Sequence, residues 1–434
     1  MQKLTLCMYR LITWALVPLV RARLKRRAAK EPLYGQWMDE RFGRYTQPAA
    51  SGWVWVHAVS LGETRAAAIL LHELRAQIPG MKLLLTHGTA TGRAEGEKLL
   101  QAGDVQVWQP WDHASSTRAF FRHFKPRMGI VMETEVWPQL CQAAQEAGVP
   151  LVLANARLND VSAAKAQRLA WLSRPAFASF AQVLAQTQDD AARLQAVGAQ
   201  RVQVMGNLKF DVSLEASALA QGQALKAASG SMPVILLASS REGEEAQFLE
   251  QIRQYAGIKS TQNATDLIAT SKPRQIQWMI VPRHPQRFDE VQRLCEQAGF
   301  SVSRRSSWLG DPMAADVWLG DSMGEMPMYF ALADLALLGG SFAPLGGQNL
   351  IEAIAAGCPV VMGPHTFNFA EACETAQQMG AALRCANMAS AVQTVLHTAQ
   401  SESVMLSLKQ QGQQWLAQSR GAAARMARAI AQMP

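Results

Sequence analysis

The sequence lacks the motifs of several common nucleotide- and metal-dependent activities. It contains no GxxxxGKS/T phosphate-binding loop and no GxGxxG fingerprint, which disfavours ATP hydrolysis and dinucleotide binding by those routes. It also contains no DxD triplet, and no two histidines have the spacing of metal ligands. We therefore expect no metal and no cofactor, so that protein cations and helix N-termini would have to stabilise any phosphate leaving group.

Cysteine and charge are also sparse. The six cysteines include no CxxC pair, which argues against a zinc site and against the disulfide framework of a secreted protein, and favours a reducing compartment. Charged residues make up only 18% of the chain, with a net charge of +8. Because no nucleic-acid-binding motif accompanies that charge, we expect no nucleic-acid partner and instead an anionic membrane or anionic substrates.

An apolar stretch at the N-terminus, Leu4–Val20, is followed directly by the basic cluster RARLKRR at Arg21–Arg27. As a helix, these seventeen residues would span about 25 Å, less than the roughly 30 Å of a bilayer's hydrocarbon layer. A cleavable signal peptide is disfavoured because the positive cluster follows the apolar run. We expect residues 1–30 to form a membrane anchor, either a marginal span or a helix in the interface, with its basic flank at the cytoplasmic surface. A helix packed on the protein itself remains the alternative.

The length of 434 residues predicts two domains. Short apolar runs alternate with helical patterns, which predicts mostly parallel sheets. The alternation stops in an Ala/Ser/Gln/Gly-rich segment at 213–232, which we interpret as an interdomain linker. We therefore expect an α/β fold with one Rossmann-like domain at 31–212 and a second at 233–434 that includes the terminal helix. The expected strands lie at 53–57, 82–86, 127–132, 150–154, 183–185 and 202–205, and then at 234–238, 277–281, 317–319, 335–338 and 360–362.

The segment Gly339–His365 is the strongest local indication of a nucleotide site. It reads as a glycine-rich turn after a strand, then a short helix and a second strand. Gly346 and Gly347 would let an anion approach the first N–H groups of that helix. Asn349 can cap the helix, and Glu352 has the capping-box spacing. The Glu352 carboxylate can alternatively bind the hydroxyls of a ribose, so both interpretations remain open.

Three further motifs in the first half follow predicted strands. In Ser60–Glu63 (SLGE) a glycine turn places Glu63 at a helix start, where its carboxylate can take a proton from a hydroxyl or only complement the helix dipole. Glu133 and Glu135 would share one face if their segment is extended, and they can stabilise a developing cation; otherwise one of them is solvent-exposed. Lys209 can meet a substrate anion or pair with Asp211 at the surface.

Two motifs in the second half carry charge at strand ends. Pro282 and Arg283 lie in VPRHPQR, a stiffened turn in which the arginine can bind phosphate or a base edge. The turn Gly320–Met326 (GDSMGEM) offers backbone N–H groups and a carboxylate, or alternatively a simple helix cap. In open α/β sheets ligands bind beyond the carboxyl ends of the strands, where all these motifs lie.

Taken together, the motifs resemble those of the bacterial 3-deoxy-D-manno-octulosonic acid (Kdo) transferases, which attach Kdo to lipid A precursor in lipopolysaccharide assembly. The resemblance runs from the N-terminus to about residue 375, in family order. It rests on SLGE (60–63), METEVWP (132–138), NARLND (155–160), GNLKFD (206–211), VPRHPQRF (281–288), GDSMGEM (320–326) and GGSFAPLGGQN with MGPHTFNF (339–369).

The resemblance implies a GT-B fold, in which two Rossmann-like domains face each other across a cleft. It implies an inverting, metal-independent glycosyltransferase at the cytoplasmic face of the inner membrane, with CMP-Kdo as donor and a lipid A precursor (lipid IVA) as acceptor. Glu63 would be the general base, and Lys209 with one of Glu133 and Glu135 would stabilise the transition state. The implied CMP-binding residues are Pro282, Arg283, Met323, Gly324, Glu325, Gly346, Gly347, Asn349, Leu350, Ile351 and Glu352.

Two positions depart from the family pattern. Gln348 stands where the glycine loop is expected to carry a histidine, and Arg241 stands where ASSREGEE is expected to carry another. Both replacements keep a hydrogen-bonding side chain, so they bear on donor affinity more than on reaction class. Two other classes compete with the transferase: a sugar-nucleotide epimerase or hydrolase of the same fold, and a non-catalytic membrane-attached binding protein.

Overall fold

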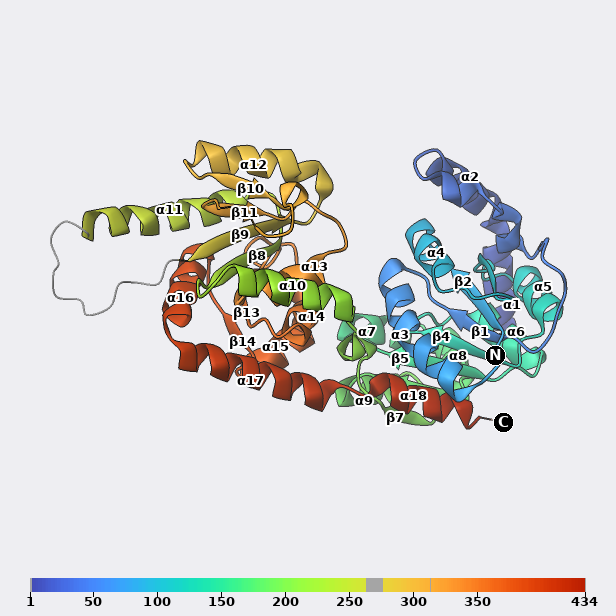
Figure 1. Cartoon of the computed structure of the whole chain (residues 1–434). Helices are drawn as coiled ribbons and strands as arrows, with labels where there is room; N and C mark the ends of the chain where they lie inside the picture. Colours follow the sequence, from blue (N-terminus) through green and yellow to red (C-terminus); the bar gives the residue numbers. More distant parts are fainter. Residues whose placement is uncertain (1, 263–275, 313, 434) are drawn as a thin grey trace. The chain divides into compact units, whose positions relative to one another are not determined.

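The chain forms two compact units, as a computed structural model describes them for residues 2–262, 276–312 and 314–433. The first unit comprises Met1–Asp211 together with Ser419–Pro434, and the second comprises Val212–Gln418 (Figure 1). Each unit is built on its own parallel sheet of seven strands, flanked by helices. The predicted α/β class with two Rossmann-like halves is confirmed.

The first sheet has the strand order β3-β2-β1-β4-β5-β6-β7. Its strands are β1 Val54–His57, β2 Leu83–His87, β3 Val105–Trp108, β4 Met128–Met132, β5 Leu151–Ala156, β6 Gln182–Ala185 and β7 Val202–Val204. The helices of this unit are α1 Gln2–Ala15, α2 Val17–Ala28, α3 Leu61–Gln77, α4 Ala90–Glu97, α5 Ala114–Phe124, α6 Pro138–Glu146, α7 Asp160–Arg168, α8 Ala170–Ala178, α9 Gln188–Ala196 and α18 Ala422–Ala431, with short turns η1 Pro32–Gly35, η2 Met38–Phe42 and η3 Leu208–Asp211.

The second sheet has the order β10-β11-β9-β8-β12-β13-β14. Its strands are β8 Val234–Ser240, β9 Gln277–Pro282, β10 Val302–Arg304, β11 Val317–Leu319, β12 Leu335–Leu338, β13 Val360–Met362 and β14 Ala382–Arg384. The helices are α10 Ala216–Ala228, α11 Glu244–Gln262, α12 Phe288–Gln297, α13 Met326–Leu332, α14 Leu350–Ala355, α15 Ala370–Gln378, α16 Met388–Gln400 and α17 Glu402–Ser419, with short turns η4 Pro285–Arg287, η5 Arg305–Ser307 and η6 Phe367–Phe369.

In both sheets the chain starts in the middle and later reverses its direction of growth. In the first sheet this topological switch point lies between β1 and β4, and in the second it lies between β8 and β12. The central strands are buried on both faces, as in β2 and β12, because helices cover a parallel sheet on both sides. Ligands of open parallel sheets bind at the carboxyl ends of the strands that flank a switch point.

Three strands were not predicted from the sequence, and all three lie at sheet edges. They are β3 (VQVW), β10 (VSR) and β14 (ALR). A strand at an edge is covered less completely, so polar residues interrupt its apolar run. The continuous apolar signal that predicts a central strand is therefore absent from these sequences.

Two expectations about domain boundaries are wrong. The segment expected to be a linker contains α10, which packs on α13; a Cβ on Gly222 would lie 2.3 Å from the backbone oxygen of Met328. The terminal helix α18 belongs to the first unit, where it packs on α3. Asp211 fixes its start by accepting hydrogen bonds from the backbone N–H groups of Gly421 at 2.5 Å and Ala423 at 2.6 Å. The Ala/Arg-rich composition of α18 gives no indication of its partner.

The N-terminal apolar stretch forms two helices, α1 and α2, instead of one. The Tyr9 hydroxyl donates to Asp112 at 2.7 Å, and Arg10 donates to Gln139 at 3.1 Å, so α1 is docked on the first unit. None of the helices in the described part of the chain combines the length and hydropathy that a membrane crossing requires. Within residues 8–20, the large apolar side chains that remain exposed are Met8, Leu11, Ile12, Trp14, Leu16 and Leu19.

Candidate active site

Glu63 lies at the switch point of the first sheet, at the start of α3 directly after β1. Ser60 caps this helix, with its Oγ accepting from the Glu63 N–H at 3.4 Å. The Glu63 carboxylate reaches back to accept from the Val59 N–H at 2.9 Å and from the Ser60 hydroxyl at 2.8 Å. These contacts hold the Glu63 carboxylate in a single position. The residue is largely buried, with 9% of its surface exposed.

The surroundings of Glu63 tune its proton affinity. Burial raises the pKa of Glu63 to about 7, the hydrogen bonds from Val59 and Ser60 oppose that rise, and the negative charges of Glu135 and Glu133 add to it. A carboxylate with a pKa near neutrality is suited to accept a proton from a hydroxyl at physiological pH. The same effects show that the three predicted acids of the first unit lie close together.

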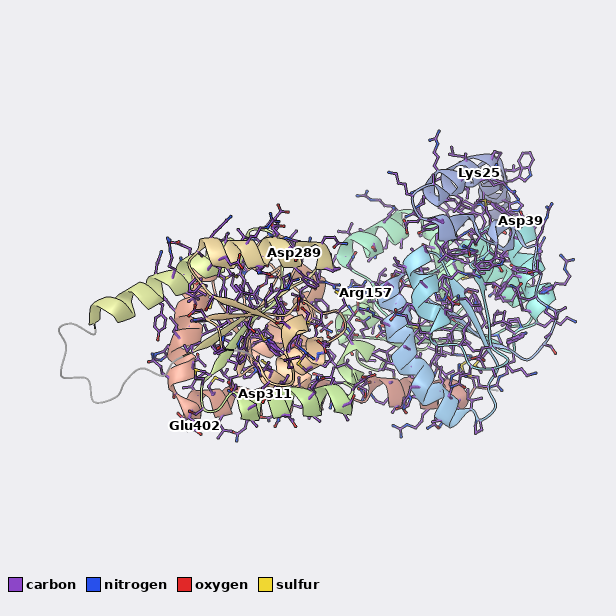
Figure 2. All side chains as sticks on the ribbon, turned by 45° about the horizontal axis from the view of Figure 1, so that its top comes forward. Lys25, Asp39, Arg157, Asp289, Asp311 and Glu402 are labelled. Atoms are coloured by element: carbon purple, nitrogen blue, oxygen red, sulfur yellow. The ribbon has the colours of Figure 1, made fainter. Side chains whose placement is uncertain are left out.

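Glu133 and Glu135 follow β4, the other strand of the switch point, but their segment is not extended. Glu133 has a left-handed backbone, with φ of 56°, because the chain turns at this residue. Arg157 forms an ion pair with Glu133, with 2.7 Å between Nε and Oε2, and its side chain is 56% exposed (Figure 2). The Trp137 indole donates to Glu135 at 2.8 Å. Neither Glu133 nor Glu135 is fully solvent-exposed, whereas the alternative interpretation of this motif expected one of them to be exposed.

Burial raises the pKa of Glu135, the Trp137 hydrogen bond lowers it, and the charge of Glu133 raises it again. Of these three acids, Glu63 and Glu135 therefore have elevated proton affinity, and Glu133 is paired with an arginine. Such a group of acids can stabilise a positive charge that develops on a sugar ring.

Left-handed backbone conformations cluster at these strand ends. Besides Glu133, Asn155 has φ of 51° near the end of β5, and Ser239 has φ of 53° near the end of β8. Non-glycine residues adopt this region at an energetic cost, and such residues concentrate at functional sites. The backbone thus marks the same edges of both sheets as the side chains do.

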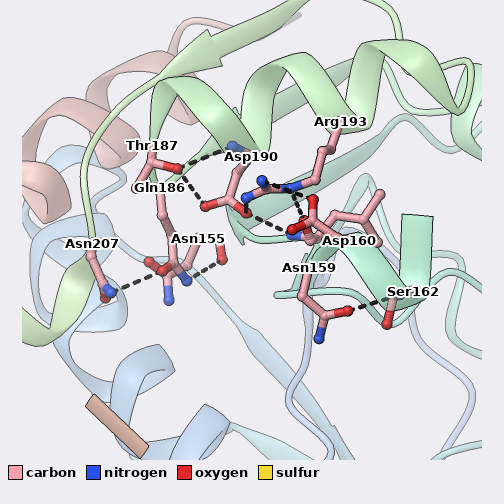
Figure 3. A network of polar contacts seen from close by, with 10 residues as sticks. Asn155, Asn159, Asp160, Ser162, Gln186, Thr187, Asp190, Arg193 and Asn207 are labelled. Carbon is pink, nitrogen blue, oxygen red and sulfur yellow. Dashed lines mark hydrogen bonds and ion pairs between the residues drawn. The ribbon is translucent and has the colours of Figure 1, made fainter. Parts of the chain in front are cut away.

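An amide network fixes the segment that carries Lys209. The Asn207 amide donates to Gln186 at 2.8 Å, and Gln186 donates to the Asn155 backbone oxygen at 2.9 Å (Figure 3). Asn207 also accepts from the Lys209 N–H at 3.0 Å. The turn η3, which contains Lys209, contacts α3, the helix of Glu63. The sequence reading assigned no role to Asn155 or Gln186, since a buried amide that supports a turn has no distinctive sequence pattern.

A second part of the same network caps α9. Asp190 accepts from the Thr187 hydroxyl at 2.7 Å and from the Leu158 N–H at 2.8 Å (Figure 3). Arg193 bonds to Asp190 and to Asp160, at 3.2 and 3.3 Å. These contacts tie the loop after β5 to the helix after β6, and so stabilise the edge on which Arg157 lies.

Glu244 occupies in the second unit the place that Glu63 occupies in the first, at the start of the helix after the first strand. Its side chain is 1% exposed. One carboxylate oxygen accepts from the backbone N–H groups of Gly340 at 2.8 Å and Arg241 at 2.9 Å; the other accepts from Phe342 at 3.1 Å and Ala343 at 3.3 Å. Glu244 thereby fastens the glycine-rich segment to the end of β8. The sequence reading missed this residue, whose only signal was an acid in the first turn of a helix.

The glycine-rich turn forms as expected and leads into α14. Gly346 and Gly347 have φ of 86° and 73°, and a Cβ on Gly346 would lie 2.5 Å from the Asn368 amide nitrogen. Asn349 caps the helix by accepting from the Ile351 N–H at 3.0 Å. Glu352 accepts from the Asn349 side-chain amide at 3.0 Å. In a complete capping box the Glu352 carboxylate would instead accept from the Asn349 backbone N–H.

The side chains of Leu350 and Ile351 are buried in the core. Any contact of these two predicted residues with a nucleotide therefore goes through the backbone. The four positions from Asn349 to Glu352 lie together at the start of α14, the helix that follows β12 in the chain, and β12 flanks the switch point of the second sheet.

The predicted turns after β9 and β11 lie at the same edge of the second sheet. Pro282 ends β9, and Arg283 follows with an exposed side chain. In the second turn Met323 is 61% exposed and Gly324 has φ of 83°. Arg305 holds the Glu325 carboxylate at 3.1 Å.

The Ser322 hydroxyl also donates to Glu325. Within the residues that the structure describes, no group of three or more His, Cys, Asp or Glu side chains has a metal-binding arrangement.

Comparison with known proteins shows to which family this chain belongs. The family described as "3-Deoxy-D-manno-octulosonic-acid transferase (kdotransferase)" matches residues 36–212. A 3-deoxy-D-manno-octulosonic acid transferase of Bordetella pertussis is 45% identical over 96% of this chain and 96% of its own. This chain belongs to the Kdo transferase family. A Kdo transferase of Haemophilus influenzae is 30% identical over 82% of this chain and 81% of its own. The protein is thus an enzyme, a glycosyltransferase.

The fold by itself does not separate a Kdo transferase from other sugar-nucleotide enzymes. A UDP-GlcNAc 2-epimerase from Neisseria meningitidis, solved with UDP-GlcNAc, covers 87% of this chain and 98% of its own with a TM-score of 0.54 at 15% identity. That likeness shows a GT-B-like fold only. The sequence relatives, and not the fold, exclude the epimerase alternative for this Kdo transferase.

Proposed function

We propose that this Kdo transferase uses CMP-Kdo as donor and a lipid A precursor, lipid IVA, as acceptor, and that it inverts the anomeric configuration without a metal ion. The observation that carries the proposal is the Glu63 carboxylate. It lies at the switch point of the first sheet, is fixed by Val59 and Ser60, and has a pKa of about 7.

The reaction is a single displacement. An acceptor hydroxyl of the lipid gives its proton to the Glu63 carboxylate, and its oxygen forms a bond to the anomeric carbon of Kdo. The bond from that carbon to the CMP phosphate oxygen breaks, and its electron pair leaves with CMP. Attack on the face opposite the leaving group inverts the configuration, and one base suffices because no covalent enzyme intermediate forms.

The carboxylates beyond Glu63 would act on the transition state. Positive charge develops on the Kdo ring as the bond to phosphate lengthens, and Glu133 and Glu135 lie near enough to Glu63 to raise its pKa. Lys209, in a turn that contacts α3, would pair with a negative group of the substrate. Preorganised charges of this kind stabilise a transition state without having to reorient during the reaction.

The second unit would bind CMP at the edge formed by Arg283, the Met323–Glu325 turn and the start of α14. Arginine matches the geometry of a phosphate, and glycines allow close approach of a nucleotide to the backbone. In the absence of a metal, cationic side chains and backbone N–H groups would take the charge of the departing phosphate.

We also propose that the N-terminal helices attach the enzyme to the cytoplasmic face of the inner membrane. Leu11 and Leu19 are 62% and 66% exposed, and basic residues of α2, including Lys25, extend from the same segment (Figure 2). An apolar strip beside a basic cluster suits an anionic lipid surface.

The membrane proposal is tested by flotation with vesicles that contain anionic phospholipid. Leu11→Ser combined with Leu19→Ser should reduce the bound fraction. Leu406→Ser, at a residue of α17 that is 55% exposed, is the matched control and should leave binding unchanged. Equal binding by all three proteins would reject the attachment.

The reaction itself is tested by incubating the purified enzyme with CMP-Kdo, with and without lipid IVA, and with a chelator. We expect mass spectrometry to show a lipid heavier by one or more Kdo residues, with CMP released. NMR of the product should show the anomeric configuration opposite to that of the donor. Retention of configuration, or loss of activity in the chelator, would contradict the corresponding part of the proposal.

A further inference from the structure

Arg241 and Gln348, which come from different loops, meet at one point of the second unit. A Cβ built on Gly340 would lie 3.4 Å from the Gln348 amide nitrogen and 3.7 Å from Cγ of Arg241. Gly340 has φ of 72°. Arg241 follows β8 and Gln348 lies beyond β12, so the pair spans the switch point of the second sheet. These are the two positions at which the sequence departs from the histidines that the family resemblance predicts.

The cations at this edge are unequally neutralised. Arg287 is bound by Glu245 at 2.6 Å and by Glu290 at 2.9 Å. No described hydrogen bond or ion pair of residues 212–262, 276–312 and 314–418 involves the guanidinium group of Arg241 or Arg283. The nearest buried acid on the Arg241 side, Glu244, is occupied by four backbone N–H groups.

The backbone also brings Arg241 and Arg283 close together, because the Arg283 N–H donates to the backbone oxygen of Ser240, the residue before Arg241, at 3.0 Å. The pKa of His284 is lowered by partial burial first, and then by the positive charges of Arg241, Arg283 and Arg287. Two guanidinium groups without a partner among the described residues, at the carboxyl edge of a parallel sheet, form a site for a compact anion.

We propose that Arg241 binds the phosphate of the nucleotide donor together with Arg283, and that Gln348 donates its amide N–H to the same phosphate from the other side of Gly340. The inference rests on CMP-Kdo being the donor. Glu244 holds Arg241 in place, because its carboxylate binds the backbone of Arg241 and that of Gly340 at the same time.

Arg241 and Gln348 would place one cation and one neutral hydrogen-bond donor at the phosphate. A guanidinium remains charged at every physiological pH, whereas a histidine loses its charge above about pH 6.5. The charged and titratable groups on the elements around Arg241 are Arg283, His284 and Arg287 after β9, Glu242, Glu244 and Glu245 after β8, and His365, whose backbone oxygen lies beside Gly347. A variant at position 241 retains all of these groups, so its comparison with the wild type reports the effect of position 241 alone.

The first test compares CMP with cytidine as ligands of the full-length protein. Arg241→Gln should weaken CMP binding, measured by calorimetry, by about tenfold to a hundredfold, and should raise the KM for CMP-Kdo more than it lowers kcat. Cytidine, assayed as an inhibitor of transfer, should be affected little because it lacks the phosphate. Arg253→Gln, which removes an exposed arginine of α11 paired with Glu250, should behave as the wild type.

The second test uses Arg241→His. Between about pH 5.5 and pH 7.5 the affinity of this variant for CMP should fall relative to that of the wild type, because its histidine loses its charge over this range. The proposal is overturned if Arg241→Gln weakens cytidine as much as CMP, if it changes neither, or if the histidine variant shows no pH dependence. A wild-type enzyme that binds no CMP would instead overturn the assignment of the donor, and the inference with it.

Discussion

The two units are each built on a parallel sheet of seven strands with a switch point beside its first strand, but they differ in strand order and carry opposite chemistry at that switch point. In the first unit the switch point between β1 and β4 gathers the acids Glu63, Glu133 and Glu135; in the second, the switch point between β8 and β12 gathers Arg241 and glycines. The order of strands fixes where loops converge, and the loop sequences decide what converges there. The proposed reaction needs both kinds of edge, one to accept a proton and one to bind a phosphate.

The comparison is sharpest between Glu63 and Glu244. Each is a buried glutamate at the start of the helix that follows the first strand of its sheet. Glu63 accepts one backbone N–H and one hydroxyl, whereas Glu244 accepts four backbone N–H groups. The carboxylate with fewer donors keeps affinity for a proton and can act as a base. The fully satisfied one is a structural anchor.

The largest expected effect comes from Glu63→Gln. An amide cannot take the proton of the acceptor hydroxyl, so kcat should fall by about a hundredfold to ten-thousandfold, while CMP binding persists. Glu97→Gln, at an exposed position of α4, is the matched control. A Glu63→Gln enzyme that folds, binds CMP and transfers at nearly the wild-type rate would refute the assigned base.

Glu244→Gln should act mainly on the fold of the glycine-rich segment. Glutamine turns an NH2 group toward backbone N–H groups that need an acceptor, which should lower the free energy of unfolding by about 1–3 kcal/mol and raise the KM for CMP-Kdo. Denaturant melts and steady-state kinetics measure the two effects, with Glu250→Gln on the outer part of α11 as control. Unchanged stability would show that the four bonds are dispensable.

The pH dependence of transfer should report Glu63. The base acts only when deprotonated, so kcat/KM, which reports the groups of the free enzyme, should rise with pH through about 7 and level off above it. About one pH unit below that value the rate should be down by about tenfold. A profile that stays flat from about pH 5.5 to pH 8 would exclude a base with this pKa.

The smallest effect is expected from Trp137→Phe. The indole hydrogen bond lowers the pKa of Glu135, so its loss should leave Glu135 more often protonated and less negative. Because the charge of Glu135 raises the pKa of Glu63, the acid limb of the profile should move to lower pH, by less than about one unit. Trp171→Phe, at a half-exposed residue of α8, should not move it. A shift toward higher pH would show that the acids are not coupled in this way.

The sequence predicted the central strands and indicated candidate site residues after them, for a physical reason. Strands such as β2 and β12 are buried on both faces, so their sequences are continuously apolar and easily recognised. The site residues follow those strands directly, as Glu63 and Arg283 do. The sequence did not predict the edge strand β3, the helix on which α18 packs or the role of Glu244. Each of these features depends on contacts between distant segments.

The return of the chain to the first unit through α18 has a consequence for how the molecule can be taken apart. Residues 212–418 are an uninterrupted stretch inserted into the first unit, whose own sequence resumes at Ser419. A fragment ending at Asp211 would expose the surface of α3 that Met426 and Ile430 cover. The second unit is therefore the segment to exchange between relatives, with both of its ends rejoined to the first unit.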